Sequence, residues 1–397
     1  MIKDLYQSAL YPGELKAMLK IKLEGSKYAP SKEPLEDLVN TGDKEFCYTA
    51  LTKVSRSFAV VIQQLPEHLK DAVCVFYLVL RALDTVEDDM RIPLQEKLPL
   101  LRSFHRKSYD PAFSMPGVGD QHDYTVLLGN YQKVSRMFLS LDPAYQEVIS
   151  DICEKMGNGM ADFAEKKVNS IDDYDLYCHY VAGLVGIGLS GLFSASGVEA
   201  LRLKDEKVIS NSMGLFLQKT NIIRDYHEDL HADRTFWPSE VWSRYIDELD
   251  KFQFAPSSPQ SLACLNELVT DALRHVPDCL RYLSLLTDKK VFRFCAIPQV
   301  MAIATLAKVY NNPDVFTGVV KIRKGLAAKL MLNTGNMDDV YNYFDQFSRE
   351  ILRKLPAYDP NYRTTKQYLE AIFNAIDEQE GRGEWTQRHE SVLEKTS

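Results

Sequence analysis

Apolar residues recur with α-helical spacing along nearly the whole chain. Strand signals are scarce, and no Asn-Gly or Asp-Gly turn joins two alternating blocks. The pattern predicts helices over residues 43–63, 69–88, 93–109, 123–139, 143–166, 171–193, 205–230, 238–245, 258–286, 291–310, 317–332, 337–353 and 364–380. The longest break, residues 110–121, is interpreted as a loop. The chain is therefore predicted to be all-α.

No Pro- or Gly-rich linker divides these helices. We therefore predict one large helical domain over residues 36–375, an irregular segment before it (1–35) and a polar tail after it (376–397). The most apolar run, residues 181–193, is shorter than the roughly 18–20 residues that span a bilayer. Its glycines indicate a buried helix instead.

The first acidic cluster, residues 84–89, ends one of the predicted helices. Helical spacing places Asp84 and Asp88 one turn apart on one face, with Glu87 beside them. Tyr77 and Arg81 continue the same stripe, opposite a wholly apolar face. Such a stripe is often a solvated surface with ion pairs from Arg81, which is the simpler alternative for this motif alone.

A second acidic cluster, residues 225–229, lies in a helix that is apolar on most sides. Its polar stripe consists of Gln218, Asn221, Asp225 and Asp229. Buried polar groups need partners, which here are water, a polar helix or a metal–phosphate cluster. Carboxylates on two helices are typical ligands of Mg²⁺, which binds through a few carboxylates and substrate phosphates. The pair of motifs therefore predicts a metal-dependent enzyme acting on a diphosphate.

Other polar residues suit the same chemistry. Tyr177 opens an apolar, glycine-rich helix, where its hydroxyl can transfer a proton or simply pack. Phe294 can line a cavity or belong to the core. Arginine and lysine suit phosphate oxygens, although each is individually also a typical surface cation. The candidates are Ser55, Arg56 and Ser57, then Arg224 and Arg234 beside the second motif, and Lys321 and Arg323.

Composition narrows the class of protein. The 397 residues are 45% hydrophobic and 26% charged, as in an ordinary soluble globular protein. A net charge of −8 argues against a nucleic-acid-binding surface. Seven scattered cysteines without a CxxC pair indicate reduced thiols.

In order along the chain, the motifs SRSF (55–58), YLVLRALDTVEDDM (77–90), YCHYVAGLVGIGLS (177–190), LQKTNIIRDYHED (217–229) and FCAIPQVMA (294–302) resemble the squalene synthase family. This family of farnesyl-diphosphate farnesyltransferases belongs to the head-to-head prenyl synthases. The resemblance covers about residues 40–335. It implies an all-α isoprenoid-synthase fold with a deep central cavity. It also implies condensation of two farnesyl diphosphates to presqualene diphosphate, which NADPH then reduces to squalene.

The resemblance also implies roles for individual residues. Tyr177 would transfer the proton in the first half-reaction, and Phe294 would help to wall a dry region for the second. Substrate would be positioned by Ser55, Ser57, Tyr77, Arg81, Gln218, Asn221, Arg224 and Arg234. The Mg²⁺ ligands would be Asp84, Glu87, Asp88, Asp225 and Asp229. NADPH would contact Arg56, Arg81, Lys321 and Arg323, although the chain has no GxGxxG fingerprint.

Two departures from the family pattern stand out. The family can carry a lysine for the cofactor in the loop corresponding to 110–123, and this loop has none. Eukaryotic members usually end in a hydrophobic helix that anchors them to the cytosolic face of the endoplasmic reticulum, which this sequence lacks. We therefore expect a monomeric catalytic fragment of a membrane-anchored enzyme.

Three alternatives stay open. One is a dehydrosqualene- or phytoene-type synthase that performs no reduction. Another is a non-catalytic helical scaffold, and a metal-dependent diphosphate hydrolase is the weakest of the three. The acidic motifs argue against the scaffold, because a scaffold has no need of like charges held together.

Overall fold

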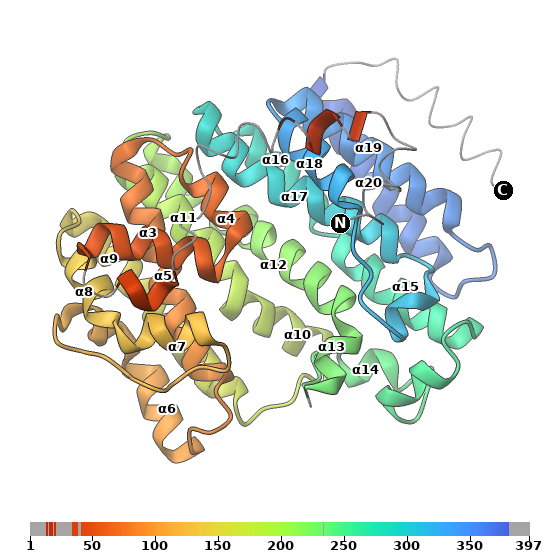
Figure 1. Ribbon diagram of the computed structural model, residues 1–397. Helices are drawn as coiled ribbons and strands as arrows, with labels where there is room; N and C mark the ends of the chain where they lie inside the picture. The colour runs from red at the N-terminus through yellow and green to blue at the C-terminus, as the bar shows by residue number, and fades with distance from the viewer. Residues whose placement is uncertain are drawn as a thin grey trace. The chain divides into compact units, whose positions relative to one another are not determined.

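The computed structural model describes residues 13–14, 16–18, 20, 34–38, 41–232 and 234–380 (Figure 1). Every regular element within these residues is a helix. The all-α prediction is thereby confirmed. Most of the predicted N-terminal segment, and the tail beyond Glu380, lie outside the described residues.

The chain folds into two compact units, each built from separated stretches of sequence. Unit 1 comprises Met1–Ile21, Lys167–Gly183 and Val208–Ser397, and unit 2 comprises Lys22–Lys166 and Leu184–Lys207. The first acidic motif belongs to unit 2, and the second motif and Tyr177 belong to unit 1. The predicted extent of one catalytic domain, residues 36–375, stays a prediction.

Unit 2 is organised around helix α5 (Glu67–Asp88), which contacts α3, α8, α9 and α11. Its predicted apolar face is buried, and Val75, Leu78 and Leu83 have no exposed surface. The other helices of this unit are α3 (Asp43–Val54), α4 (Arg56–Ile62), α6 (Leu94–Ser103), α7 (His122–Gly129), α8 (Tyr131–Leu139), α9 (Pro143–Phe163) and α11 (Leu184–Ala195), with the 3₁₀ turns η2 (Leu35–Leu38), η3 (Phe104–Tyr109) and η5 (Leu201–Asp205).

In unit 1 the central helix is α17 (Lys289–Val309), which packs against α16, α18 and α19. The remaining elements are α10 (Ile171–Cys178), η4 (His179–Gly183), α12 (Lys207–Arg224), α13 (Tyr226–His231), α14 (Ser239–Trp242), η6 (Leu249–Phe254), α15 (Pro259–Leu273), α16 (Val276–Ser284), η7 (Pro313–Phe316), α18 (Lys324–Asn333), α19 (Met337–Lys354) and α20 (Tyr362–Glu380).

Several predicted helices are interrupted, and one began too early. Breaks fall at Ser55, Asn130 and Asp225, where non-helical backbone angles separate one helix from the next and none of the three side chains caps the following helix. The helix predicted over 317–332 begins only at Lys324. The preceding residues Thr317–Arg323 include a glycine and three β-branched side chains after the threonine, which favour extended backbone.

Two described helical stretches are long and apolar enough to cross a membrane by those criteria alone, Ile171–Ala195 and Lys289–Val309. Of their most apolar windows, 44% and 78% of the residues are buried within the protein. The core helix of a soluble protein passes the same test, so this finding is weak evidence for membrane insertion.

Candidate functional site

The end of α5 carries the first of the two acidic motifs. The Arg81 guanidinium donates through Nη1 to Asp84, at 2.6 Å, and through Nη2 to the Tyr77 hydroxyl, at 3.3 Å. Burial alone would lower the pKa of Arg81, but Asp84 and Tyr77 outweigh burial and raise that pKa. The side chains of Arg81 and Asp84 remain 26% and 29% exposed. The predicted stripe is confirmed as a half-buried, polar face.

The neighbouring carboxylates of this motif are not equivalent. Glu87 and Asp88 are half-buried beside Asp84, whereas Asp89 is only 3% exposed. Asp89 accepts hydrogen bonds from the Arg91 side chain and from the backbone nitrogen of Gly119. The bonds from Arg91 hold the pKa of Asp89 well below its usual range. Asp89 therefore fastens the loop 110–121 to the end of α5.

The second acidic motif spans a break between two helices. Asp225 ends α12 and caps α13 with φ −93° and ψ 10°, yet the backbone ladder continues from Asn221 through Asp225 to Asp229. Arg224 binds the Asp225 carboxylate through two nitrogens, at 2.5 and 2.7 Å. Arg234 lies 3.3 Å from Asp229. Both predicted arginines thus accompany carboxylates of this motif.

The polar stripe of α12 is more accessible than its sequence suggests. Asn221 is exposed and Gln218 is half-buried, whereas Ile222 and Ile223 between the polar residues are buried. The side chains that the sequence assigned to substrate therefore share the accessible face of this helix. That assignment stays a prediction.

Tyr177 lies near the end of α10, a helix of two turns. Its side chain is 8% exposed and stacks on Phe236, with ring centroids 4.9 Å apart and an interplanar angle of 19°. Immediately after it, His179–Gly183 form a turn of π-helix. Such turns interrupt helices frequently at functional sites.

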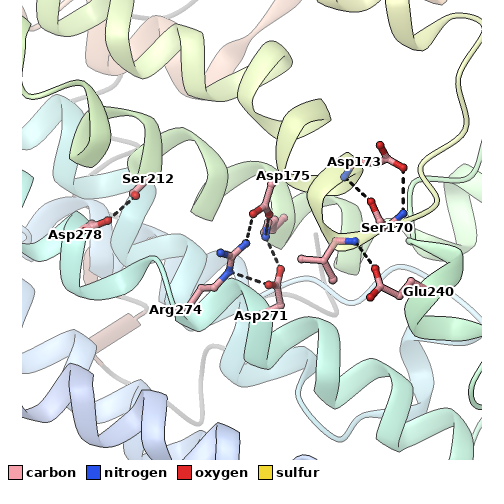
Figure 2. Close-up of polar contacts among 10 residues, drawn as sticks. Ser170, Asp173, Asp175, Ser212, Glu240, Asp271, Arg274 and Asp278 are labelled. Carbon is pink, nitrogen blue, oxygen red and sulfur yellow. Dashed lines mark hydrogen bonds and ion pairs between the residues drawn. The ribbon is translucent and has the colours of Figure 1, made fainter.

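A network of polar contacts anchors α10 (Figure 2). At its N-terminus Ser170 and Asp173 form a capping box, and Glu240 accepts a hydrogen bond from the backbone nitrogen of Ile171. Further along, Arg274 binds both Asp175 and Asp271. This short helix is therefore held by its neighbours rather than by its own length.

Lys219 completes the network from the interior of α12. Its side chain has no exposed surface and donates to Asp175, at 2.5 Å, and to Asp271. Burial alone would raise the pKa of Asp175, but Lys219 and Arg274 together hold it below its ordinary value. Two carboxylates thus meet two cations, which fixes α10 against α12 and α15.

Backbone packing brings α12 even closer to the π-helical turn. A Cβ atom on Gly214 would lie 2.1 Å from the carbonyl oxygen of Ala182, and one on Gly183 would lie 1.9 Å from Oδ1 of Asn211. His179 contributes a hydrogen bond to the same Asn211, at 2.7 Å. At Gly214, which meets backbone atoms, only glycine fits without displacing the helices, whereas a side chain at Gly183 would displace the side chain of Asn211.

The residues predicted for the cofactor lie in different surroundings. Lys321 is exposed in the extended segment that precedes α18. Arg323 is bound by Glu14 through Nη2, at 2.6 Å, and Nε, at 3.2 Å. Ser55 lies at the break between α3 and α4. The side chains of Arg56 and Ser57 lie outside the described residues.

Other predictions have simpler outcomes. Phe294 is 5% exposed on α17, which fits its predicted role as an apolar wall and equally a place in the core. All seven cysteines are buried and none of them forms a disulfide, as expected of reduced thiols. Burial raises the pKa of thiols such as Cys74 and Cys279, which leaves them protonated.

The donors at the two acidic motifs fit Mg²⁺ in kind. Aspartate and glutamate supply hard oxygen ligands, and Mg²⁺ typically takes one or two of them together with phosphate oxygens. Among the described residues no three His, Cys, Asp or Glu side chains are already gathered as a metal site. The metal assignment of Asp84, Glu87, Asp88, Asp225 and Asp229, like the convergence of the two motifs, stays a prediction.

Residues 51–325 match the family model of squalene/phytoene synthases. The chain belongs to the squalene/phytoene synthase family. This family member is 52% identical to squalene synthase 1 of Arabidopsis thaliana over 365 residues, which cover 91% of this chain and 87% of that protein. It is 50% identical to inactive squalene synthase 2 of the same plant over 371 residues, covering 91% and 86%.

A solved structure agrees with these sequence relationships. The structure of TcSQS with the ligand BPH1237 matches this squalene/phytoene synthase with a TM-score of 0.82 and 47% identity, covering 85% of this chain and 99% of that one. The predicted isoprenoid-synthase fold is thereby confirmed.

Three residues that contact the predicted site residues or the helices that carry them were not predicted from the sequence. Tyr124 places its ring 5.3 Å from the guanidinium carbon of Arg81, Phe236 covers Tyr177, and Lys219 ties α12 to α10. The available signal was the position of Lys219 in a helix that is apolar on most sides, because a lysine among buried residues must have partners. Nothing in the sequence pattern indicates the other two contacts, which join separate segments.

Proposed function

We propose that this protein is a squalene synthase that condenses two farnesyl diphosphates into presqualene diphosphate and reduces this product with NADPH to squalene. The observation that carries the proposal is the identity of about half of all residues, over 91% of the chain, with a plant squalene synthase. The polar residues at both acidic motifs support it. They matter because an inactive relative is almost as similar.

Mg²⁺ would be bound by Asp84, Glu87, Asp88, Asp225 and Asp229. When bound, the metal polarises the diphosphate leaving group and neutralises its developing charge. Arg81, Arg224 and Arg234 would bind diphosphate oxygens, since each already places a guanidinium beside a motif carboxylate. A diphosphate would be positioned by these donors before its bond to the prenyl group breaks.

Tyr177 would move the proton that is lost when the cyclopropyl ring of presqualene diphosphate forms. Its side chain is buried and held by Phe236, so its hydroxyl has a defined direction. The apolar residues that follow it, and Phe294 on α17, would exclude water from the carbocation. Water would otherwise quench that cation before rearrangement and reduction.

NADPH would be bound through Lys321 and Arg323, which precede the N-terminus of α18, together with Arg56 and Arg81. Cations beside a helix N-terminus suit phosphate groups. The loop 110–121 supplies no lysine, and its glycines are already engaged by Arg91. We therefore assign no cofactor contact to this loop. We also propose that the enzyme is a monomer acting at the cytosolic face of the endoplasmic reticulum.

Product analysis with farnesyl diphosphate and Mg²⁺, with and without NADPH, tests this function. Squalene is expected with NADPH, and presqualene diphosphate or unreduced products without it. The same unreduced hydrocarbon under both conditions would assign the chain to the dehydrosqualene group. No condensation under either condition would contradict the proposed function and favour a non-catalytic role, as in the inactive relative.

A further inference from the structure

The guanidinium of Arg81 is held by more than the partners on its own helix. Its carbon lies 5.8 Å from the ring centroid of Tyr77 and 5.3 Å from that of Tyr124, which belongs to α7. Both distances fall within the range of cation–π attraction. Tyr124 is half-buried, and burial raises the pKa of its hydroxyl, so it is a neutral phenol at pH 7.

We propose that Tyr124 is a positioning residue for Arg81, and that the loop 110–121 sets Tyr124 in place. The proposal rests on the proposed function, in which Arg81 binds diphosphate. Tyr124 itself needs no contact with the substrate. It acts by restricting the guanidinium to one orientation before the diphosphate arrives.

The polar partners of Arg81 do not fix the orientation of its guanidinium by themselves. Asp84 fixes Nη1 and the Tyr77 hydroxyl takes Nη2 over a longer distance, 3.3 Å. The buried Nε of Arg81 has no acceptor. A guanidinium with one strong contact can rotate about it, and a second aromatic ring within cation–π distance restricts that rotation at little entropic cost.

The loop 110–121 is fastened to α5 immediately before α7 begins. Asp89 accepts from the Gly119 nitrogen, at 2.9 Å, while Arg91 donates to the carbonyl oxygens of Gly117 and Gly119, at 3.0 and 2.9 Å. Both glycines have positive φ, 83° and 128°. Other residues rarely adopt this backbone, which therefore depends on glycine.

The contacts that hold the loop 110–121 to α5 continue into α7. A Cβ atom on Gly119 would lie 3.1 Å from the Thr85 methyl group and 3.0 Å from the Thr125 nitrogen, so the loop is tightly packed between α5 and α7. Thr125 also donates to the Gly119 carbonyl oxygen, at 3.2 Å. We call the contacts of Asp89 and Arg91 with Gly117 and Gly119 the latch. Because Tyr124 directly precedes Thr125, the latch fixes the start of α7, the helix that carries the Tyr124 ring.

The test replaces Tyr124 and follows two quantities: kcat/KM for presqualene diphosphate formation without NADPH, and the Kd of inorganic pyrophosphate with Mg²⁺. Tyr124→Leu is expected to lower kcat/KM and to raise this Kd, each about 3- to 30-fold, as loss of one cation–π contact predicts. Tyr124→Phe, which keeps the ring, is expected to retain at least half of wild-type kcat/KM. Tyr358→Leu is the matched control, because Tyr358 is 77% exposed.

A double-mutant cycle distinguishes positioning from a general structural effect. In an Arg81→Met background, Tyr124→Leu is expected to change the pyrophosphate Kd less than twofold, because the cation that Tyr124 positions is already absent. The proposal is overturned if Tyr124→Leu behaves as wild type, or if its effect is equally large in both backgrounds.

A second variant leaves the ring in place and opens the latch from the surface. Arg91→Gln removes a side chain that is 66% exposed, so folding should be retained. It is expected to raise the pyrophosphate Kd at least twofold, and an unchanged Kd would contradict the role of the loop. Because pyrophosphate binding needs no turnover, these results stand apart from the product analysis, which alone decides whether the chain makes squalene.

Discussion

The carboxylates at the end of α5 have different roles within one short motif, because their local surroundings differ. Asp84 is half-exposed and shares a hydrogen bond with Arg81, so it can exchange this partner for a metal ion. Asp89 is buried and bound by Arg91 and Gly119, so its lone pairs are already used. Residues of one type, five positions apart, therefore differ in what they can bind.

Asp84→Asn or Asp225→Asn should each abolish formation of presqualene diphosphate, with a loss of at least about 100-fold in rate. An amide cannot supply the negative charge that Mg²⁺ requires. The measurement is the initial rate with farnesyl diphosphate and Mg²⁺. Asp151→Asn serves as a control, because Asp151 is an exposed residue paired with Lys155, outside both motifs. Near-normal product formation by either motif variant would refute its metal role.

Glu14→Gln should lower the KM for NADPH about two- to fivefold. Glu14 now accepts from the Nε and Nη2 donors of Arg323, the same fork that a cofactor phosphate needs. Removing the charge of Glu14 weakens this competitor and leaves the backbone unchanged. Steady-state kinetics at saturating farnesyl diphosphate measure the change. A raised KM would show instead that Glu14 orients Arg323 for the cofactor.

At the scale of helices, the short α10 depends on its neighbours. Two turns of helix are unstable alone, and this one carries Tyr177. It is fixed by charged residues on α12 and α15 and by the contact between Gly214 and the π-helical turn. Buried ion networks of this kind can specify one arrangement of helices rather than add net stability, which is how we interpret it here.

Lys219→Met should lower the free energy of unfolding by about 3–5 kcal/mol, because it leaves Asp175 and Asp271 with one cation instead of two. Urea denaturation measures this loss. Adding Asp271→Asn restores a neutral cluster and should recover part of the stability. If the double variant were less stable than Lys219→Met, charge balance would not be the reason for the network.

For the molecule as a whole, one buried histidine links folding to pH. His275 is 6% exposed. Besides burial, the charges of Lys219 and Arg274 lower its pKa, whereas the charge of Asp175 raises it. Burial, followed by these two cations, lowers the pKa of His275 to about 3 from its ordinary 6.5. Between about pH 3 and pH 6.5, His275 therefore carries a proton in the unfolded chain and none in the folded chain.

Stability should consequently fall as the pH drops from 6.5 toward 3, by up to about 1.4 kcal/mol per pH unit from this group. Above pH 6.5 the histidine is neutral in both states and contributes no slope. His275→Gln should flatten the dependence in that window, which urea midpoints at pH 7, 6, 5 and 4 would show. An equal slope in wild type and variant would exclude His275 as its source.

Helical periodicity was sufficient to predict nearly every helix, because burial of an apolar stripe is a local property of sequence. The prediction missed the helix breaks at Ser55 and Asp225, because a single residue with non-helical backbone angles leaves the apolar stripe of the sequence unchanged. The candidate carboxylates and arginines could likewise be predicted from the sequence, because like charges in an apolar helix need partners of opposite charge.

The sequence by itself determined the all-α class, the two acidic motifs and the family, because these depend on residue types at short, regular spacing. Only the tertiary structure showed that Asp89 fastens a loop, that Tyr124 faces Arg81, and that Lys219 ties α12 to the helix of Tyr177. Such contacts join residues about 30 to 45 positions apart. They depend on how helices pack and where loops return, which no local pattern of polar and apolar residues records.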